Sequence, residues 1–274
     1  MALCYKPPSV VRSPICRRPT PQRPIPLGTR PSISWLRRIG EVSCLGLVVT
    51  AVAPSAAASG SLGPLGIALV VAFLVLSLGI HEAAHAWVAY RCGDPTAKEL
   101  GRMTLNPIPH IDLWMTILLP GLLAFMGAPI FGGAKPVPVN FHRLRSPLRD
   151  MALVALAGPA SNFLIAIVFA AAWKICIAYG GYEQDSLMAL VLQWSFFSNV
   201  MLTAFNLIPI PPLDGSRVMT WLLPAPMRHG YMALERFGIL LVFLLLYIPQ
   251  VRALLFQMGD GIMSLIASLT SGIG

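Results

Sequence analysis

The 274-residue chain contains little charge: Asp, Glu, Lys and Arg together make up 11% of it, whereas 56% of its residues are hydrophobic. Soluble domains usually carry about 25% charged residues, so this composition excludes a soluble globular protein. Apolar surface on this scale has to be covered by lipid. We therefore expect an α-helical polytopic membrane protein that is embedded in a lipid bilayer.

Paired cysteines are also missing. The five cysteines form no C-x-x-C pair and follow no regular spacing. A disulfide framework and a thiolate metal site both depend on regularly spaced cysteines, so the pattern argues against both. We interpret these cysteines as apolar filler.

Acidic residues are absent from the first 40 positions, which hold eight Lys and Arg. The remaining chain has 12 basic and 11 acidic residues, so this tail carries almost all of the formal net charge of +9. Pro- and Arg-rich sequence without periodicity is typical of disorder, and the lack of acids also resembles an organellar transit peptide; a wrongly assigned start is a third interpretation. The tail contains no nucleic-acid-binding motif, so we do not expect nucleic acid as a partner.

Five stretches are apolar and long enough to cross a bilayer, whose hydrocarbon core of about 30 Å needs about 20 helical residues. A weaker stretch at 42–58 is either a short first span or a signal-like segment. We therefore expect five to six transmembrane helices and three regions: a basic tail with this segment (1–60), an intramembrane core (61–230) and C-terminal transmembrane helices (231–274). The five stretches are Leu65–Tyr90, Met151–Tyr179, Leu187–Ile208, Phe237–Ile248 with its flanks, and Ala253–Leu269.

The sequence His81-Glu82-Ala83-Ala84-His85 lies at the C-terminal end of the first apolar stretch. Residues four apart share one face of a helix, so both imidazoles can bind one metal ion, and Glu82 beside them can accept a proton from water. Two histidines and a glutamate on an exposed helix could also be ordinary solvated residues. Ionisable groups deep in an apolar segment are costly and usually serve a function, which favours a zinc site.

Catalytic zinc usually has three protein ligands, and this motif supplies two. Asp214 is the best third ligand, because it follows the proline-rich end of the stretch 187–208 and precedes Gly215, which permits a sharp turn. Taken alone, Leu-Asp-Gly after prolines is typical of a surface turn. Beside an intramembrane H-E-x-x-H motif the ligand interpretation is favoured, since the coordination is otherwise incomplete.

A shared site requires that His85 and Asp214 lie on the same side of the membrane. One crossing at 151–179 and a return at 187–208 satisfy this requirement, whereas a further crossing at Leu113–Phe131 does not. Proline and glycine interrupt that segment, so we predict that it is re-entrant, entering the membrane and returning. The loop 180–186 then carries only acidic charge while Lys and Arg gather on the site side, and the positive-inside rule predicts a cytoplasmic site.

Two motifs and the segment between them carry a specific resemblance. H-E-x-x-H at 81–85 and N-x-x-P-x-P-P-L-D-G at 206–215, with Gly158-Pro159-Ala160-Ser161-Asn162 between them, resemble the site-2 protease family of intramembrane zinc metalloproteases. The resemblance covers about residues 65–217, in the family's motif order. It implies one zinc ion per chain, with the following site residues: His81, His85 and Asp214 as ligands, Glu82 as general base, and Asn206 as a polar group near the substrate or its oxyanion.

The resemblance also implies a location and a substrate class. Many members carry a PDZ domain between the motifs or a CBS pair at the C-terminus, and this chain has room for neither, so it resembles the compact bacterial members. We expect the bacterial inner membrane, with an organellar membrane as the alternative. The implied substrates are single-span transmembrane proteins, cut within or near the bilayer. Val137–Phe141 is our candidate for a β-like edge that pairs with an unwound substrate.

Several interpretations stay open at this stage. The site could belong to an ion or metal transporter, although such a site does not need Glu82 and the chain lacks repeated halves. It could also belong to an inactive scaffold, although every expected zinc group is present. Asn162 either bonds across helices or lines the substrate path. The remaining histidines, His110, His142 and His229, are expected to be solvated loop residues, and His110 could also contribute to the surroundings of the site.

Overall fold

The computed structural model describes residues 63–119, 122, 125–126 and 132–273. The basic tail and the weak apolar stretch at 42–58 lie outside the described residues. Within the described ranges the chain is mainly helical and contains no β-strand. This confirms the α-helical class that the composition predicts.

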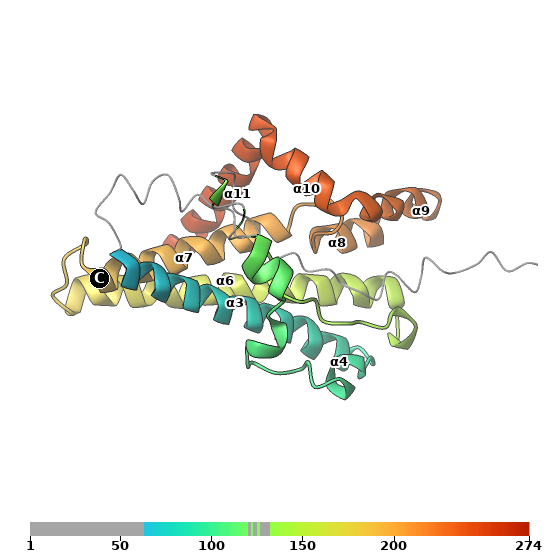
Figure 1. Cartoon of the computed structure of the whole chain (residues 1–274), viewed down its shortest axis with the longest axis horizontal. Coiled ribbons are helices and arrows are strands. Elements are labelled where there is room, and N and C mark those ends of the chain that lie inside the picture. Colours follow the sequence, from blue (N-terminus) through green and yellow to red (C-terminus); the bar gives the residue numbers. More distant parts are fainter. Residues whose placement is uncertain (1–62, 120–121, 123–124, 127–131, 274) are drawn as a thin grey trace, which may run out of the picture. The chain divides into compact units, whose positions relative to one another are not determined.

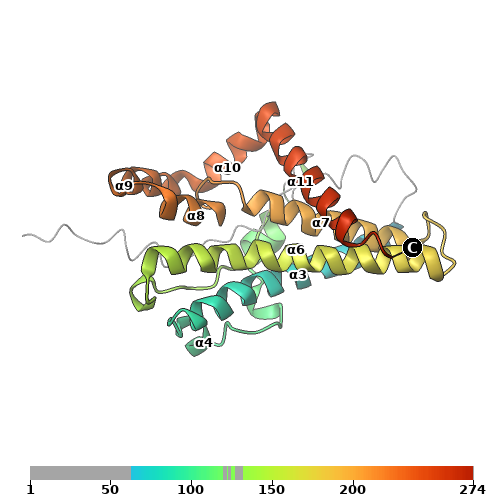
Figure 2. The ribbon, with the colours of Figure 1, turned by 180° about the vertical axis from the view of Figure 1, so that it is seen from behind.

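Three helices are long and apolar enough to cross a membrane: α3 (Gly63–Arg91), α6 (Pro147–Tyr179) and α7 (Leu187–Asn206). They pack against one another and lie side by side in both views (Figures 1 and 2). The apolar stretches at 65–90, 151–179 and 187–208 predict these helices. We call the end at which α3 ends, α6 begins and α7 ends the site end.

The other helices are shorter or less apolar. α10 (Gly238–Tyr247) has 10 residues, and Pro249 then opens α11 (Pro249–Leu269) with 21 residues. Both match predicted apolar stretches, but neither is among the helices that qualify as spans, so the predicted total of five to six spans is not confirmed. The remaining elements are α4 (Thr96–Glu99), η1 (Ile108–His110), η2 (Leu113–Leu118), η3 (Phe141–Arg143), α8 (Gly215–Leu222), α9 (Ala225–Ala233) and η4 (Leu234–Phe237).

Polar side chains join the three long helices. Asn199 of α7 donates from Nδ2 to Ser77 Oγ of α3 at 3.1 Å. Thr203, one turn further along α7, shares its Oγ1 proton between the Asn199 carbonyl of its own helix at 2.9 Å and the Pro159 carbonyl of α6 at 3.3 Å. Polar contacts between membrane helices help to set their register.

The stretch between α3 and α6 leaves the site end and returns to it. The amide of Arg145, just before α6, donates to the carbonyl of Cys92, just after α3, at 3.1 Å. The ends of the predicted re-entrant segment also meet, because Thr116 Oγ1 donates to the Gly133 carbonyl at 2.6 Å. The described ends of this segment therefore lie together, as a segment without a net crossing requires, and its entry into the membrane stays a prediction.

The predicted β-like edge at Val137–Phe141 does not form a strand. Phe141 opens the helical turn η3, and of the residues before it, 132–140, only Pro138 takes part in a single β-bridge, with no extended strand in the described chain. Pro136 and Pro138 have no amide proton, and the Val137 amide is already donated to Glu82 at 2.9 Å. An edge that lacks these donors is poorly suited to pair with a substrate strand.

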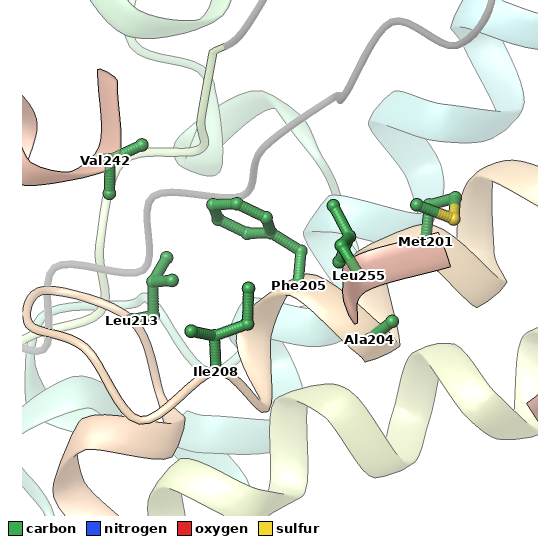
Figure 3. Packing of buried hydrophobic residues seen from close by; sticks show 7 residues of the cluster. All are labelled: Met201, Ala204, Phe205, Ile208, Leu213, Val242 and Leu255. Carbon is green, nitrogen blue, oxygen red and sulfur yellow. The ribbon is translucent and has the colours of Figure 1, made fainter. Parts of the chain in front are cut away.

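A hydrophobic cluster packs the loop after α7 against the C-terminal helices (Figure 3). Phe205 enters it from the end of α7, Ile208 and Leu213 from the loop, Val242 from α10 and Leu255 from α11. Leu213 is fully buried. The cluster therefore fixes the backbone immediately before Asp214.

Candidate metal centre

Three side chains that are far apart in the sequence meet at the site end. His81 and His85 come from α3, and Asp214 comes from the loop between α7 and α8. The two Nε2 atoms lie 3.1 Å apart, and Asp214 Oδ2 lies 3.3 Å from His81 Nε2 and 3.5 Å from His85 Nε2. All three residues are buried. The structure thus brings together the three residues that the sequence predicts as ligands.

The spacing of these atoms fits zinc. Ligands about 2.0–2.1 Å from a tetrahedral metal ion lie roughly 3.3–3.4 Å from one another. The three measured separations, 3.1, 3.3 and 3.5 Å, are close to that edge length. Two imidazoles and one carboxylate also form a donor set that zinc prefers, with a fourth position left for water or substrate.

Each imidazole is held through its other nitrogen. His85 Nδ1 lies 2.6 Å from the Val154 carbonyl of α6, which can only accept, so Nδ1 carries the proton and Nε2 keeps its lone pair. His81 Nδ1 lies 3.0 Å from the side-chain amide of Asn162. Asn162 Oδ1 is buried without a partner among the described residues, so exchanging the amide oxygen and nitrogen gives Nδ1–H an acceptor. Both contacts orient Nε2 toward the metal position.

Gly158 packs directly against the Nε2 atoms of the two histidines. A Cβ added there would lie 2.5 Å from His81 Nε2 and closer still to His85 Nε2. Only glycine leaves room for both rings at this point of α6. The site therefore needs three helices, because α6 supplies Gly158, Val154 and Asn162 around the ligands of the other two segments.

Glu82 lies next to the histidines with its two oxygens in different surroundings. Oε2 accepts from the Val137 amide at 2.9 Å. Oε1 is buried and has no hydrogen-bond partner among the described residues. One oxygen is thus held in place, and the other can take a proton.

Asp214 follows a turn that packs tightly on the end of α7. A Cβ on Gly215 would collide with the carbonyl oxygens of Leu207 and Ile208, so the chain needs glycine where it turns back into α8. Burial alone would raise the pKa of Asp214, but a proton on His85 or His81 beside it lowers the pKa below its ordinary value. A metal ion held by the two imidazoles would take the place of that proton and would likewise favour the ionised carboxylate.

Known proteins are similar to most of the described chain. The sequence profile of peptidase family M50, the site-2 proteases, matches residues 68–178 and 173–247. The chain belongs to this family. YwhC of Bacillus subtilis (strain 168), which is named as a zinc metalloprotease, is 40% identical over 181 residues that cover 64% of this chain and 78% of YwhC.

Relatives of lower identity are named as zinc metalloproteases too. Rip2 of Mycolicibacterium smegmatis, also named as a zinc metalloprotease, is 30% identical over 201 residues, or 69% of this chain and 71% of Rip2. MJ0611 of Methanocaldococcus jannaschii, named likewise, is 30% identical over 102 residues, or 36% of this chain and 50% of MJ0611. No solved structure matches the chain significantly. The protein is thus a zinc metallopeptidase of the site-2 protease family with zinc as its cofactor, which argues against the transporter interpretation.

Asn206, the fifth residue predicted for this site-2 protease, lies at the C-terminal end of α7 and is buried. Its Nδ2 donates to the Leu202 carbonyl one turn earlier at 3.0 Å, and its Oδ1 has no partner among the described residues. Oδ1 is therefore an unpaired acceptor inside the protein among the described residues, and a role of Asn206 toward the substrate stays a prediction.

Sequence reasoning missed other residues of this site-2 protease. Gly158 was part of the motif that carries the resemblance, but the sequence does not show that it touches the ligands. The Val154 carbonyl and the Val137 amide are backbone groups that leave no signal in residue identity. His110 was expected to be solvated and is instead buried, with Nε2 3.1 Å from the Thr104 carbonyl; burial lowers its pKa.

Proposed function

We propose that this site-2 protease hydrolyses peptide bonds of single-span transmembrane proteins within or near the bilayer. The observation that carries the proposal is the burial of His81, Glu82, His85 and Asp214 where three membrane-spanning helices meet. A buried site between membrane helices is reached most directly by substrates that are themselves in the membrane. Family membership supports a membrane-protein substrate, and the single-span class is our proposal.

In this proposal His81, His85 and Asp214 hold one zinc ion. When bound, zinc would polarise the scissile carbonyl and lower the pKa of water so that it can lose a proton and attack near neutral pH. Val154 and Asn162 keep the two imidazoles oriented, and Gly158 leaves room for them. The cluster that buries Leu213 keeps Asp214 in reach.

Glu82 is the proposed general base. The Val137 amide fixes Oε2, and Oε1 takes the proton from the attacking water and later gives it to the leaving amine. Asn206 is proposed to donate its remaining amide hydrogen to the substrate carbonyl or its oxyanion, because its other donor is satisfied by Leu202.

The test separates catalysis from metal binding. Glu82→Gln keeps the size of the side chain but removes the proton acceptor, so cleavage of a tagged single-span substrate in liposomes should fall by roughly 10²–10⁴-fold while zinc content stays near one ion per chain. Asp214→Ala removes a ligand, so zinc content and cleavage should fall together. His142→Ala changes an exposed histidine and should alter neither.

Two results would refute the proposal. Cleavage by Glu82→Gln at the wild-type rate, with contaminating peptidases excluded, would show that Glu82 is not the general base. Undiminished zinc content in Asp214→Ala would show that Asp214 is not a ligand. Comparison of the membrane proteomes of cells that carry wild type or Glu82→Gln would identify substrates by the fragments that accumulate.

We also propose that the site end faces the cytoplasm, in a bacterial inner membrane. The excess of Lys and Arg on that side supports this orientation. In a background without native cysteines, Pro95→Cys and Arg145→Cys should both react with an impermeant thiol reagent only from the cytoplasm. Gly181→Cys, in the loop between α6 and α7, should react only from the other side. Labelling in the reverse pattern would contradict the orientation.

A further inference from the structure

A second cavity lies apart from the metal centre, between the start of α6 and the pair α8–α9. It has a volume of about 730 Å³, within the range of small-molecule sites. Its walls are mainly apolar and include Leu148 and Met151 of α6 and Trp221 of α8. Three arginines also line it, Arg149, Arg217 and Arg228, and no Asp or Glu is among its lining residues in the described chain.

The three arginines differ in how far their charge is balanced. Arg217 is almost fully buried and makes two hydrogen bonds to Glu235 at 2.6 and 3.0 Å, while its Nε has no partner in the described part of the chain. Arg149 pairs with Asp150 at 3.1 Å. Arg228 has no carboxylate within ion-pair distance among the described residues.

The position of Arg228 is nevertheless fixed. Its Nε donates to the Leu223 carbonyl at the end of α8 at 2.9 Å. A carbonyl holds the guanidinium without cancelling its charge, so the cavity keeps a net positive charge next to apolar walls. Arginine in such a setting suits a phosphate group, which can accept several of its hydrogen bonds at once.

The surroundings of the cavity suit a lipid headgroup. Met151 precedes Gly158 by seven residues, about 10 Å of helix, so the cavity lies between the metal centre and the start of α6. Trp221, Leu222 and Met227 are exposed on α8 and α9 beside it. Amphipathic segments with Trp, Leu and Arg typically lie in the headgroup region of a membrane.

We propose that this cavity binds an anionic phospholipid. The phosphate would be held by Arg228 and by the free Nε of Arg217, and the glycerol and first acyl carbons would contact Leu148, Met151 and Trp221. The mainly apolar walls favour a phospholipid over a small soluble anion. This site is separate from peptidase activity, so it can be tested without a substrate.

The test measures which lipids the purified full-length protein retains. The protein in mild detergent is equilibrated with equal amounts of phosphatidylglycerol and phosphatidylcholine, and bound lipids are counted by native mass spectrometry. Wild type should retain phosphatidylglycerol in preference to phosphatidylcholine. Arg228→Gln should bind phosphatidylglycerol about tenfold more weakly, the expected loss for one charged hydrogen-bond partner.

Two further variants separate the cavity from general surface charge. Arg236→Gln removes the same charge from an exposed residue that does not line the cavity, and should bind like wild type. Ala225→Trp keeps every charge but places an indole in the cavity, and should lose phosphatidylglycerol as Arg228→Gln does. Zinc content verifies that each variant is folded.

Three outcomes would overturn the proposal. Equal losses in Arg228→Gln and Arg236→Gln would show that any surface charge attracts the lipid. Wild-type retention in both Arg228→Gln and Ala225→Trp would show that the lipid binds elsewhere. Displacement of the lipid by millimolar inorganic phosphate would show that the cavity serves a soluble anion.

Discussion

The two sides of the metal centre are built by different means. His81 and His85 lie on one regular helix, and their spacing of four residues brings them to one face whatever surrounds them. Asp214 lies in a loop after a run of prolines, where no regular spacing fixes its position. Its place depends on the packing of Leu213 and on the close approach of Gly215 to the end of α7.

This difference predicts how each side fails. On the helical side His81 and His85 always stay adjacent. Zinc binding is therefore lost only when a neighbouring residue displaces their imidazole rings or no longer holds them in place. On the loop side the ligand can move away as a whole when its anchor weakens. Substitutions that leave all three ligands in place can therefore tell the two sides apart.

The largest effect is expected for Gly158→Ala. The added Cβ would overlap both Nε2 atoms, and α6 cannot shift without breaking its contacts to α3 and α7. Zinc content should fall and peptidase activity should drop by about 10²-fold or more, since small misplacements at a reacting centre are that costly. Gly230→Ala is the matched control, because a Cβ there meets nothing within 4 Å. Normal zinc and activity in Gly158→Ala would show that the histidines can move without loss.

A smaller effect is expected for the partner of His81. Asn162→Leu removes the group beside Nδ1, and zinc affinity should fall about 10–100-fold, as is usual for residues that orient a ligand. Asn162→Asp still offers an acceptor and should keep affinity near that of wild type. Competition with a calibrated chelator measures both. If the Leu and Asp variants bind zinc equally, the contact does not orient His81.

The smallest effect on zinc is expected on the loop side. Leu213→Ala leaves a cavity in the cluster of Figure 3 and should destabilise the fold by about 2–5 kcal/mol, which lowers the thermal unfolding midpoint. Gly215 and the other members of the cluster still hold the loop, so Asp214 should stay within reach of the metal and zinc affinity should fall by less than about tenfold, roughly 1.4 kcal/mol. Leu234→Ala changes an exposed leucine and should alter neither. If Leu213→Ala lost more zinc affinity than Asn162→Leu, zinc binding would depend more on the loop side than on the helical side.

The fold class, the three long helices and the metal ligands can be predicted from the sequence alone. Composition and apolar length determine that it is a membrane protein and place α3, α6 and α7, because hydropathy is a local property of the chain. The spacing of His81 and His85 and the need for a third ligand single out Asp214, since zinc chemistry restricts the choice. The requirement for one shared side also predicts that 113–131 makes no net crossing.

Tertiary structure alone decided what surrounds those residues. The contacts of Glu82 with Val137, His85 with Val154 and His81 with Asn162 join residues 55, 69 and 81 positions apart. Two of the three use backbone groups, which every residue type provides, so no sequence pattern marks them. The same is true of the buried His110 and of Val137, whose amide is committed to Glu82 rather than to a strand edge. Such contacts depend on which helix faces pack together, and this is fixed only when the three helices assemble.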